Sequence, residues 1–279
     1  MAVETALSRA SVAIIVAPNG ARKTKQDHQN LPMTIEELVA EARACQAAGA
    51  AMIHLHARDI HGRHSLEIED NLPVYHAVKE AVGDKMIVQL TTEAVGQYSA
   101  LQQMALIKAV RPEAASFALR ELIPDDKSEK AASDFFCWVA GKNILSQIIL
   151  YDEADIERYF RYRSSGILPD HNQHVLVVLG RYHKNQQSSP WDLHGLRLEQ
   201  FRQEGIRCAV CAFGEKEQDC LTSAMLLGLD VRVGFENNHL DATGELAKSN
   251  AAQVKALSDI SQLVNVPLDD VYSLRASLS

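Results

Sequence analysis

Two histidines and one glutamate stand out as residues that could hold a metal ion. His54 and His56 lie two positions apart in the apolar segment IHLHARD, and Glu236 closes the segment RVGFE. Successive side chains of a β-strand point to opposite faces, so both imidazoles would share one face of a strand. Two imidazoles, one carboxylate and an open fourth position form a ligand set typical of catalytic zinc sites.

Each half of this ligand set also has a simpler explanation. A histidine pair on a strand is compatible with core or rim residues that are satisfied by hydrogen bonds. Arg232 and Glu236 could form an ordinary buried ion pair. The metal interpretation therefore depends on whether the fold brings the two segments together.

The chain alternates short apolar runs with longer segments of helical period. Helical segments such as Thr34–Ala48 begin with a capping box, here Thr34 and Glu37, and Gly49 ends this one. Eight β-α units predict a (β/α)8 TIM barrel as a single domain over residues 1–279. An open doubly wound sheet is the alternative, but no glycine-rich phosphate loop follows any of the runs. The expected strands are Val12–Ala17, Met52–Ala57, Lys85–Thr91, Ala114–Leu119, Ser146–Tyr151, His174–Leu179, Ile206–Phe213 and Val231–Glu236.

A barrel would bring the histidines and the glutamate together. Active sites of this fold form at the carboxyl ends of the strands, where His54, His56 and Glu236 are expected. The eighth strand would neighbour the first, and the first would neighbour the second, which separates the two halves by about 10 Å. By the same rule His174, which opens the sixth run, lies at the wrong end for a metal site.

Further polar residues are expected at the same rim of the barrel. Each taken alone is better explained as a satisfied polar residue, but their shared position at strand ends favours a site. They are Asn19 and Arg22 after the first run, Gln89, Thr91 and Glu93 around the end of the third, and Ser116, Arg120 and Glu121 around the end of the fourth.

Three other features predict structure rather than chemistry. Cys208 and Cys211 lie three apart on one run, so their side chains would point to opposite faces and form neither a disulfide nor a shared metal site. The segment His61–His64 predicts a solvated turn, with a small chance of a ligand contact. Glu215 and Glu217 precede a helix, where acidic residues are favourable without any function.

Composition limits the possible classes of function. The chain has 279 residues and a net charge of -8, without a basic cluster that would bind nucleic acid or an anionic membrane. No run approaches the ~20 apolar residues of a membrane span. Five cysteines without framework spacing suit a reducing compartment. We therefore expect a cytoplasmic enzyme.

The motifs together resemble the β-keto acid cleavage enzymes, typified by 3-keto-5-aminohexanoate cleavage enzyme. The likeness covers nearly the whole chain and includes NGA, NLPMTIEEL, AGAAMIHLHARD, QLTTEAVG and RVGFENN. The resemblance implies a zinc-dependent (β/α)8 barrel, usually a homotetramer. It also implies a reaction in which a β-keto acid and acetyl-CoA give acetoacetate and a new acyl-CoA through a retro-Claisen cleavage.

The resemblance also assigns roles to residues of this chain. It implies that His54, His56 and Glu236 bind zinc, which as a Lewis acid favours loss of a proton between the two carbonyls. It implies catalytic roles for Arg232, Thr91 and Asn237, where Arg232 supplies positive charge and the other two orient substrate or water. The residues expected to bind substrate are Arg22, Asn19, Ser116 and Glu93.

The chain departs from the family pattern at two of these positions. Asn237 stands where the typical enzyme has an aspartate that partners the arginine, and an amide cannot accept a proton at neutral pH. Glu93 or Glu121 could supply the base instead. Arg22 stands where the typical enzyme has a glutamate for the substrate amino group, so we expect a different β-keto acid with an anionic or polar tail.

Other functions remain open at this point. Arg181 and Lys184 could meet the phosphates of CoA, although a solvated loop is the better explanation. A metal-dependent hydrolase of the amidohydrolase kind would need further histidines, and the fifth run, SQIILY, offers none. A CoA-independent lyase and a non-catalytic metal- or ligand-binding barrel are the remaining alternatives.

Overall fold

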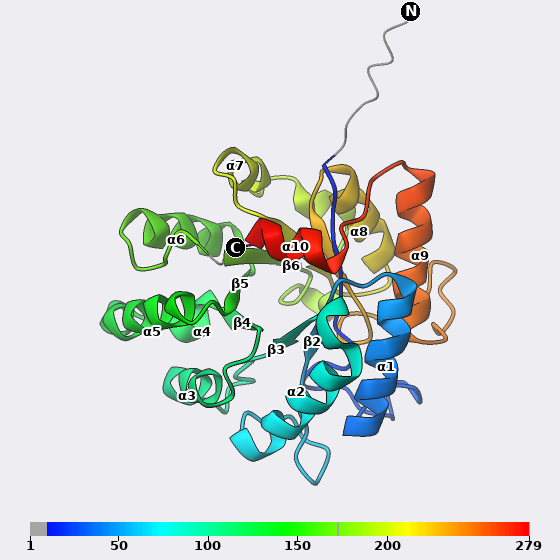
Figure 1. Ribbon diagram of the computed structural model, residues 1–279. Helices are drawn as coiled ribbons and strands as arrows, with labels where there is room; N and C mark the ends of the chain where they lie inside the picture. Colours follow the sequence, from blue (N-terminus) through cyan, green and yellow to red (C-terminus); the bar gives the residue numbers. More distant parts are fainter. Residues whose placement is uncertain (1–9, 172, 279) are drawn as a thin grey trace, which may run out of the picture.

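Eight parallel strands close into a barrel in the computed structural model, which describes residues 10–171 and 173–278 (Figure 1). The strands pair in chain order, and the eighth closes the barrel by pairing with the first. This topology confirms the predicted (β/α)8 barrel. That residues 1–279 form one domain stays a prediction. The strands are β1 (Ile14–Val16), β2 (Met52–Leu55), β3 (Ile87–Leu90), β4 (Ala114–Ala118), β5 (Leu145–Leu150), β6 (Gln173–Leu179), β7 (Cys208–Ala212) and β8 (Asp230–Val233).

Helices surround the barrel on its outer face (Figure 1). The first begins as predicted, because the side chains of Thr34 and Glu37 cap each other's backbone N–H groups, and it ends at Gly49 with φ of +111°. None of the helices in the described ranges is long and apolar enough to cross a bilayer. They are α1 (Ile35–Ala48), α2 (Ile68–Val82), α3 (Ala100–Val110), α4 (Leu119–Leu122), α5 (Glu129–Gly141), α6 (Glu153–Ser164), α7 (Leu198–Gln203), α8 (Glu217–Leu226), α9 (Asn250–Leu263) and α10 (Val271–Leu278).

The strands are buried on both faces, which explains their continuous apolar sequences. Ile15 pairs with Met52 and Met52 with Ile87, and all three fill the barrel interior. The alternation that turns Met52 inward also turns His54 inward two residues later, where it pairs with Gln89 of β3. The strand pleat therefore aims the first histidine at the barrel axis.

The amino-terminal end of the barrel is closed by α10. Val271, Leu274 and Leu278 of this helix belong to the same apolar cluster as the barrel interior. Figure 1 shows α10, in red, lying across the strands. Access to the interior is consequently left to the carboxyl end of the strands.

A buried charge network ties the strands together at the closed end. The carboxylate of Asp230 accepts hydrogen bonds from Arg207 Nε at 2.6 Å and from Ala13 N–H at 2.6 Å, and it lies 3.0 Å from Nε2 of His174. Burial alone would raise the pKa of Asp230, but His174 and Arg207 lower it to about 2. His174 thus pairs with Asp230 at the closed end of the barrel, the end at which its place in the sequence put it.

The folded pKa of Asp230 predicts how stability depends on pH. Because it lies below the ordinary value of 3.8, the stabilisation is present above about pH 4 and is lost as the pH falls through about 2. We expect Asp230→Asn to lower the free energy of unfolding by about 2–3 kcal/mol near neutral pH, and by less in acid. Urea unfolding over this pH range measures both effects, and equal neutral stability of the two proteins would contradict the prediction.

Candidate metal centre and active-site pocket

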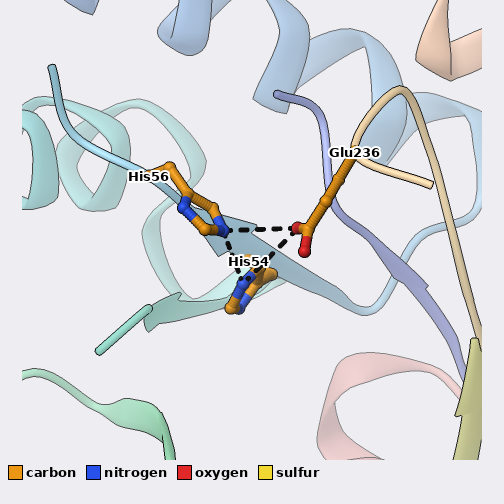
Figure 2. Close-up of side chains that lie close together, drawn as sticks. All are labelled: His54, His56 and Glu236. Carbon is orange, nitrogen blue, oxygen red and sulfur yellow. Dashed lines mark hydrogen bonds and ion pairs between the residues drawn. The ribbon is translucent and has the colours of Figure 1, made fainter. Parts of the chain in front are cut away.

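The side chains of His54, His56 and Glu236 meet at the open end of the barrel (Figure 2). The Nε2 atoms of the two histidines are 3.0 Å apart. The Oε2 atom of Glu236 lies 3.3 Å from Nε2 of His56 and 3.6 Å from Nε2 of His54. A tetrahedral zinc ion with ligands at ~2.0–2.1 Å separates its donor atoms by roughly 3.3 Å. The three donor atoms have the spacing of one ligand set.

The protonation of these groups fits a divalent cation. Burial lowers the pKa of His54 to about 4 and holds that of His56 well below its ordinary value, although Glu236 raises both. Two neutral Nε2 atoms at 3.0 Å repel each other through their lone pairs unless a proton or a cation lies between them. Oε2 of Glu236 has no hydrogen-bond partner within the described ranges. Two nitrogen donors and one anionic oxygen suit zinc.

A second layer of contacts orients the histidines. Oε1 of Gln89 lies 2.7 Å from Nδ1 of His54, which places the proton on Nδ1 and leaves the Nε2 lone pair for a metal. Asn19 donates from Nδ2 to the carbonyl of His56 at 2.9 Å. Asn19, expected to bind substrate, therefore supports the backbone of a candidate ligand.

Glu236 reaches this position from a turn, not from a strand. The sequence predicted a strand that runs to Glu236, but β8 ends at Val233 and Gly234 has φ of +141°. Arg232 Nη2 nevertheless donates to Oε1 of Glu236 at 3.2 Å. Burial raises the pKa of Glu236, but Arg232 and the two histidines outweigh it and hold that pKa well below its ordinary value.

A pocket extends from the candidate metal ligands across the barrel mouth. One wall is polar and includes Thr91, Ser116 and Arg232, as expected for the site. The hydroxyl of Ser116 and the Nε and Nη1 atoms of Arg232 are buried and have no hydrogen-bond partner among residues 10–171 and 173–278. The rest of the lining includes apolar and aromatic side chains, namely Ala118, Ile149, Tyr151, Val178 and Phe213. A pocket that combines unpaired donors with apolar side chains suits a ligand that is anionic at one end.

An ion pair spans the mouth of this pocket. Glu93, which follows β3, accepts a hydrogen bond from Arg181, which follows β6, at 2.9 Å. The other oxygen of Glu93 lies 4.0 Å from Nδ1 of His56. Burial, with Glu236, raises the pKa of Glu93 to about 7, while Arg181 opposes the shift. Arg181 thus lines the pocket and is no freely solvated loop residue, while the side chain of Lys184 lies outside the described part.

Among the residues expected to be catalytic or to bind substrate, Asn237, Arg22 and Asn19 do not line this pocket. Asn237 is buried, and neither its Nδ2 nor its Oδ1 has a hydrogen-bond partner in the described part of the chain. Arg22 is exposed and lines a neighbouring depression together with Arg58 and Arg63. Arg22 is close enough to oppose the rise in the pKa of Glu93, so the charge of Arg22 acts at the edge of the site.

Two predictions made from the sequence were incomplete. His61 is exposed, but His64 is buried, and its Nε2 lies 2.8 Å from the carbonyl of Glu93. Glu215 is exposed, whereas Glu217 is buried and accepts from the N–H of Gly234 at 3.3 Å. Burial raises the pKa of Glu217 to about 8. Nothing in a polar turn or a helix start signals such burial.

The two cysteines of the segment CAVC behave as predicted. Cys208 packs in the core outside the barrel and Cys211 in the core inside it, and both are free thiols. The inward Cys211 accepts a hydrogen bond from Arg232 at 3.4 Å. Cys211 thus helps to place the candidate catalytic arginine.

The sequence from residue 11 to residue 279 matches the model of the beta-keto acid cleavage enzyme family. The chain belongs to this family. It is therefore an enzyme, and the resemblance of its motifs is confirmed.

Two curated relatives carry specific names. The chain is 30% identical over 251 residues to the 3-keto-5-aminohexanoate cleavage enzyme of Acetoanaerobium sticklandii, covering 87% of this chain and 88% of that protein. It is 26% identical over 273 residues to 3-oxoadipate:acetyl-CoA acetyltransferase of Cupriavidus necator, covering 95% and 93%.

A solved structure, that of apo ObcA, has the same fold. It superposes with a TM-score of 0.66 at 18% identity, covering 89% of this chain and 65% of that chain. The chain thus spans about two thirds of the solved protein. At this identity the likeness supports the barrel alone.

The close approach of Gly20 to Glu236 predicts a sensitive position. A Cβ atom on Gly20 would lie 2.6 Å from Cγ of Glu236, and Gly20 has φ of +65°. We expect Gly20→Ala to displace the carboxylate and weaken metal binding by about 10-fold or more. Gly166→Ala is the matched control, because Gly166 has φ of +75° and open space around it. Zinc titration of the two variants distinguishes displacement from backbone strain, and equal affinities would contradict the prediction.

Proposed function

We propose that the chain is a zinc-dependent enzyme that condenses a β-keto acid with acetyl-CoA and releases acetoacetate and a new acyl-CoA. Family membership supports the β-keto acid cleavage, and the names of relatives that act with acetyl-CoA support the co-substrate. The observation that carries the zinc dependence is the spacing of the donor atoms of His54, His56 and Glu236. A CoA-independent lyase or a hydrolase has no comparable support.

The bound metal would contribute electrostatic stabilisation. His54, His56 and Glu236 would hold the zinc ion, which would supply a Lewis acid to the site. Arg232 donates from Nε and Nη1 to the substrate carboxylate, because these two groups have no partner among the described residues. The hydroxyls of Thr91 and Ser116 orient the substrate between them, since both residues line the pocket.

Glu93 accepts the proton that leaves the carbon between the two carbonyls. Asn237 cannot do so, because its amide has no basic atom at neutral pH. Glu93 lines the pocket, whereas the carboxylate of Glu121 accepts the N–H of Ala94 at 3.0 Å and does not line it. The resulting carbanion attacks the acetyl thioester and the thiolate of CoA leaves. The thiolate then adds to the original keto carbon, the carbon–carbon bond breaks to give the new acyl-CoA, and Glu93 returns its proton to the carbanion of acetoacetate.

The cations at the mouth select an anionic or polar substrate tail. Arg22 is exposed at the edge of the site and has no ion-pair partner within the described residues. An amino-bearing tail would meet like charge there, while a carboxylate would be paired. The relative named for 3-oxoadipate, a dicarboxylate, supports this proposal.

The metal ligands give the first test. We expect His54→Ala, His56→Ala and Glu236→Ala each to lose bound zinc and acetyl-CoA-dependent release of acetoacetate together. Metal analysis of the purified proteins, and assays with β-keto acids that have acidic, neutral and amino-bearing tails, measure both losses. Turnover that survives the triple change would refute the metal mechanism, and a preference for amino-bearing substrates would refute the tail assignment.

The choice between the two carboxylates gives the second test. Glu93→Gln should lower kcat by about 10²- to 10⁴-fold at saturating zinc, the usual contribution of a general base. Glu121→Gln is the matched control and should change kcat by less than about threefold, because its amide oxygen still accepts the backbone N–H. Steady-state kinetics with both variants checks this. A larger loss for Glu121→Gln than for Glu93→Gln would reverse the assignment.

A further inference from the structure

Side chains from two distant helices hold the backbone turn that carries Glu236. The N–H of Gly234 donates to Oε1 of Glu217 at 3.3 Å. The N–H of Phe235 donates to Oδ1 of Asn250 at 2.7 Å. Neither bond belongs to a strand ladder or to a helix, so the shape of the turn depends on these two side chains.

Both side chains are buried polar groups at helix starts. Glu217 is 2% exposed at the first position of α8, and Asn250 is 0% exposed at the first position of α9. Asn250 also donates from Nδ2 to the carbonyl of Pro18 at 3.2 Å, which ties the turn to the loop after β1. Burying such groups is costly unless each makes its hydrogen bonds, and here the bonds go to the turn.

The turn is also packed too tightly to move on its own. A Cβ atom on Gly234 would lie 2.4 Å from the carbonyl oxygen of Ala17 and 3.0 Å from Oδ1 of Asn250. The N–H of Glu236 donates to the same carbonyl of Ala17 at 3.1 Å. In addition, Lys23 donates from Nζ to the carbonyl of Phe235 at 2.9 Å. The backbone next to the carboxylate is thus fixed from β1, α8 and α9 at once.

We infer that Glu217 and Asn250 are positioning residues of the metal centre, acting through Gly234 and Phe235 on the carboxylate of Glu236. The inference rests on the proposed metal site. A ligand contributes fully only when it is held within ~0.5 Å of its productive position, and strand β8 ends before it can do this. Residues 217 and 250 supply the constraint that the strand does not.

Zinc affinity of the metal-free protein tests the inference without reference to activity. We expect Glu217→Met and Asn250→Ala to weaken zinc binding by about 10- to 100-fold, measured by competition with a chromogenic chelator. Glu217→Gln keeps an oxygen that accepts the N–H of Gly234, so its affinity should stay within about threefold of the wild type. Asn250→Ser, which is too short to reach Phe235, replaces Asn250→Ala if that variant does not fold.

A buried hydrogen bond at the other end of the barrel provides the control for general destabilisation. The Tyr159 hydroxyl donates to Oε1 of Gln173 at 3.0 Å, and Gln173→Ala removes this hydrogen bond far from the turn. It should lower Tm with unchanged zinc affinity. If the wild type binds no zinc, the proposed function itself fails. If the wild type binds zinc and Glu217→Met and Asn250→Ala bind it equally well, only the positioning inference is overturned.

Discussion

The burial of one carboxylate is the constraint on which the rest of the site depends. Glu236 is ionised in an environment that disfavours charge, because its pKa is held low despite desolvation. Arg232 pairs with one of its oxygens, and the other lies 3.3 Å from Nε2 of His56 and 3.6 Å from Nε2 of His54, two imidazoles whose own pKa values are lowered by burial. A charge left uncompensated at such a position would cost several kcal/mol. A divalent cation between the three donor atoms would remove this cost and also the repulsion between the two Nε2 atoms. The electrostatics and the geometry therefore both favour a metal ion.

The two ends of the barrel use buried polar groups in opposite ways. At the closed end, Asp230 is surrounded by donors, and its bonds to Arg207 and His174 link neighbouring strands. At the open end, the hydroxyl of Ser116 and two nitrogens of Arg232 have no partner among the described residues. Unsatisfied polar groups destabilise a fold, and Ser116 and Arg232 line the pocket beside the candidate metal ligands, so a ligand explains their unpaired atoms better than stability does. The contacts of Asp230 stabilise the closed end, while the unpaired atoms of Ser116 and Arg232 at the open end remain available to a ligand.

The sequence predicted most of the fold, because the apolar runs, the helix caps and the number of strands all indicate a (β/α)8 barrel. Alternation placed His54 on the inward face correctly, since β2 is regular up to Leu55. It failed after Val233, where the chain leaves the strand at Gly234, and Glu236 reaches the ligands through a turn. The burial of Glu217 could not be predicted, because it depends on packing against a turn that is remote in the sequence. Periodicity in the sequence predicts regular strands and helices. It could not predict the positions of Glu236 and Glu217, because both depend on the turn at Gly234.

The substitution at position 237 changes where negative charge lies in the site. An aspartate there, as in the typical family enzyme, would place a second carboxylate beside Glu236 in a buried position, and two like charges in one site disfavour ionisation of both. Asn237 removes this repulsion but also removes the proton acceptor. Glu93 provides a carboxylate across the pocket, where Arg181 at 2.9 Å partly neutralises it. Because Arg181 opposes the rise that burial causes in the pKa of Glu93, this ion pair favours the ionised form that a base requires.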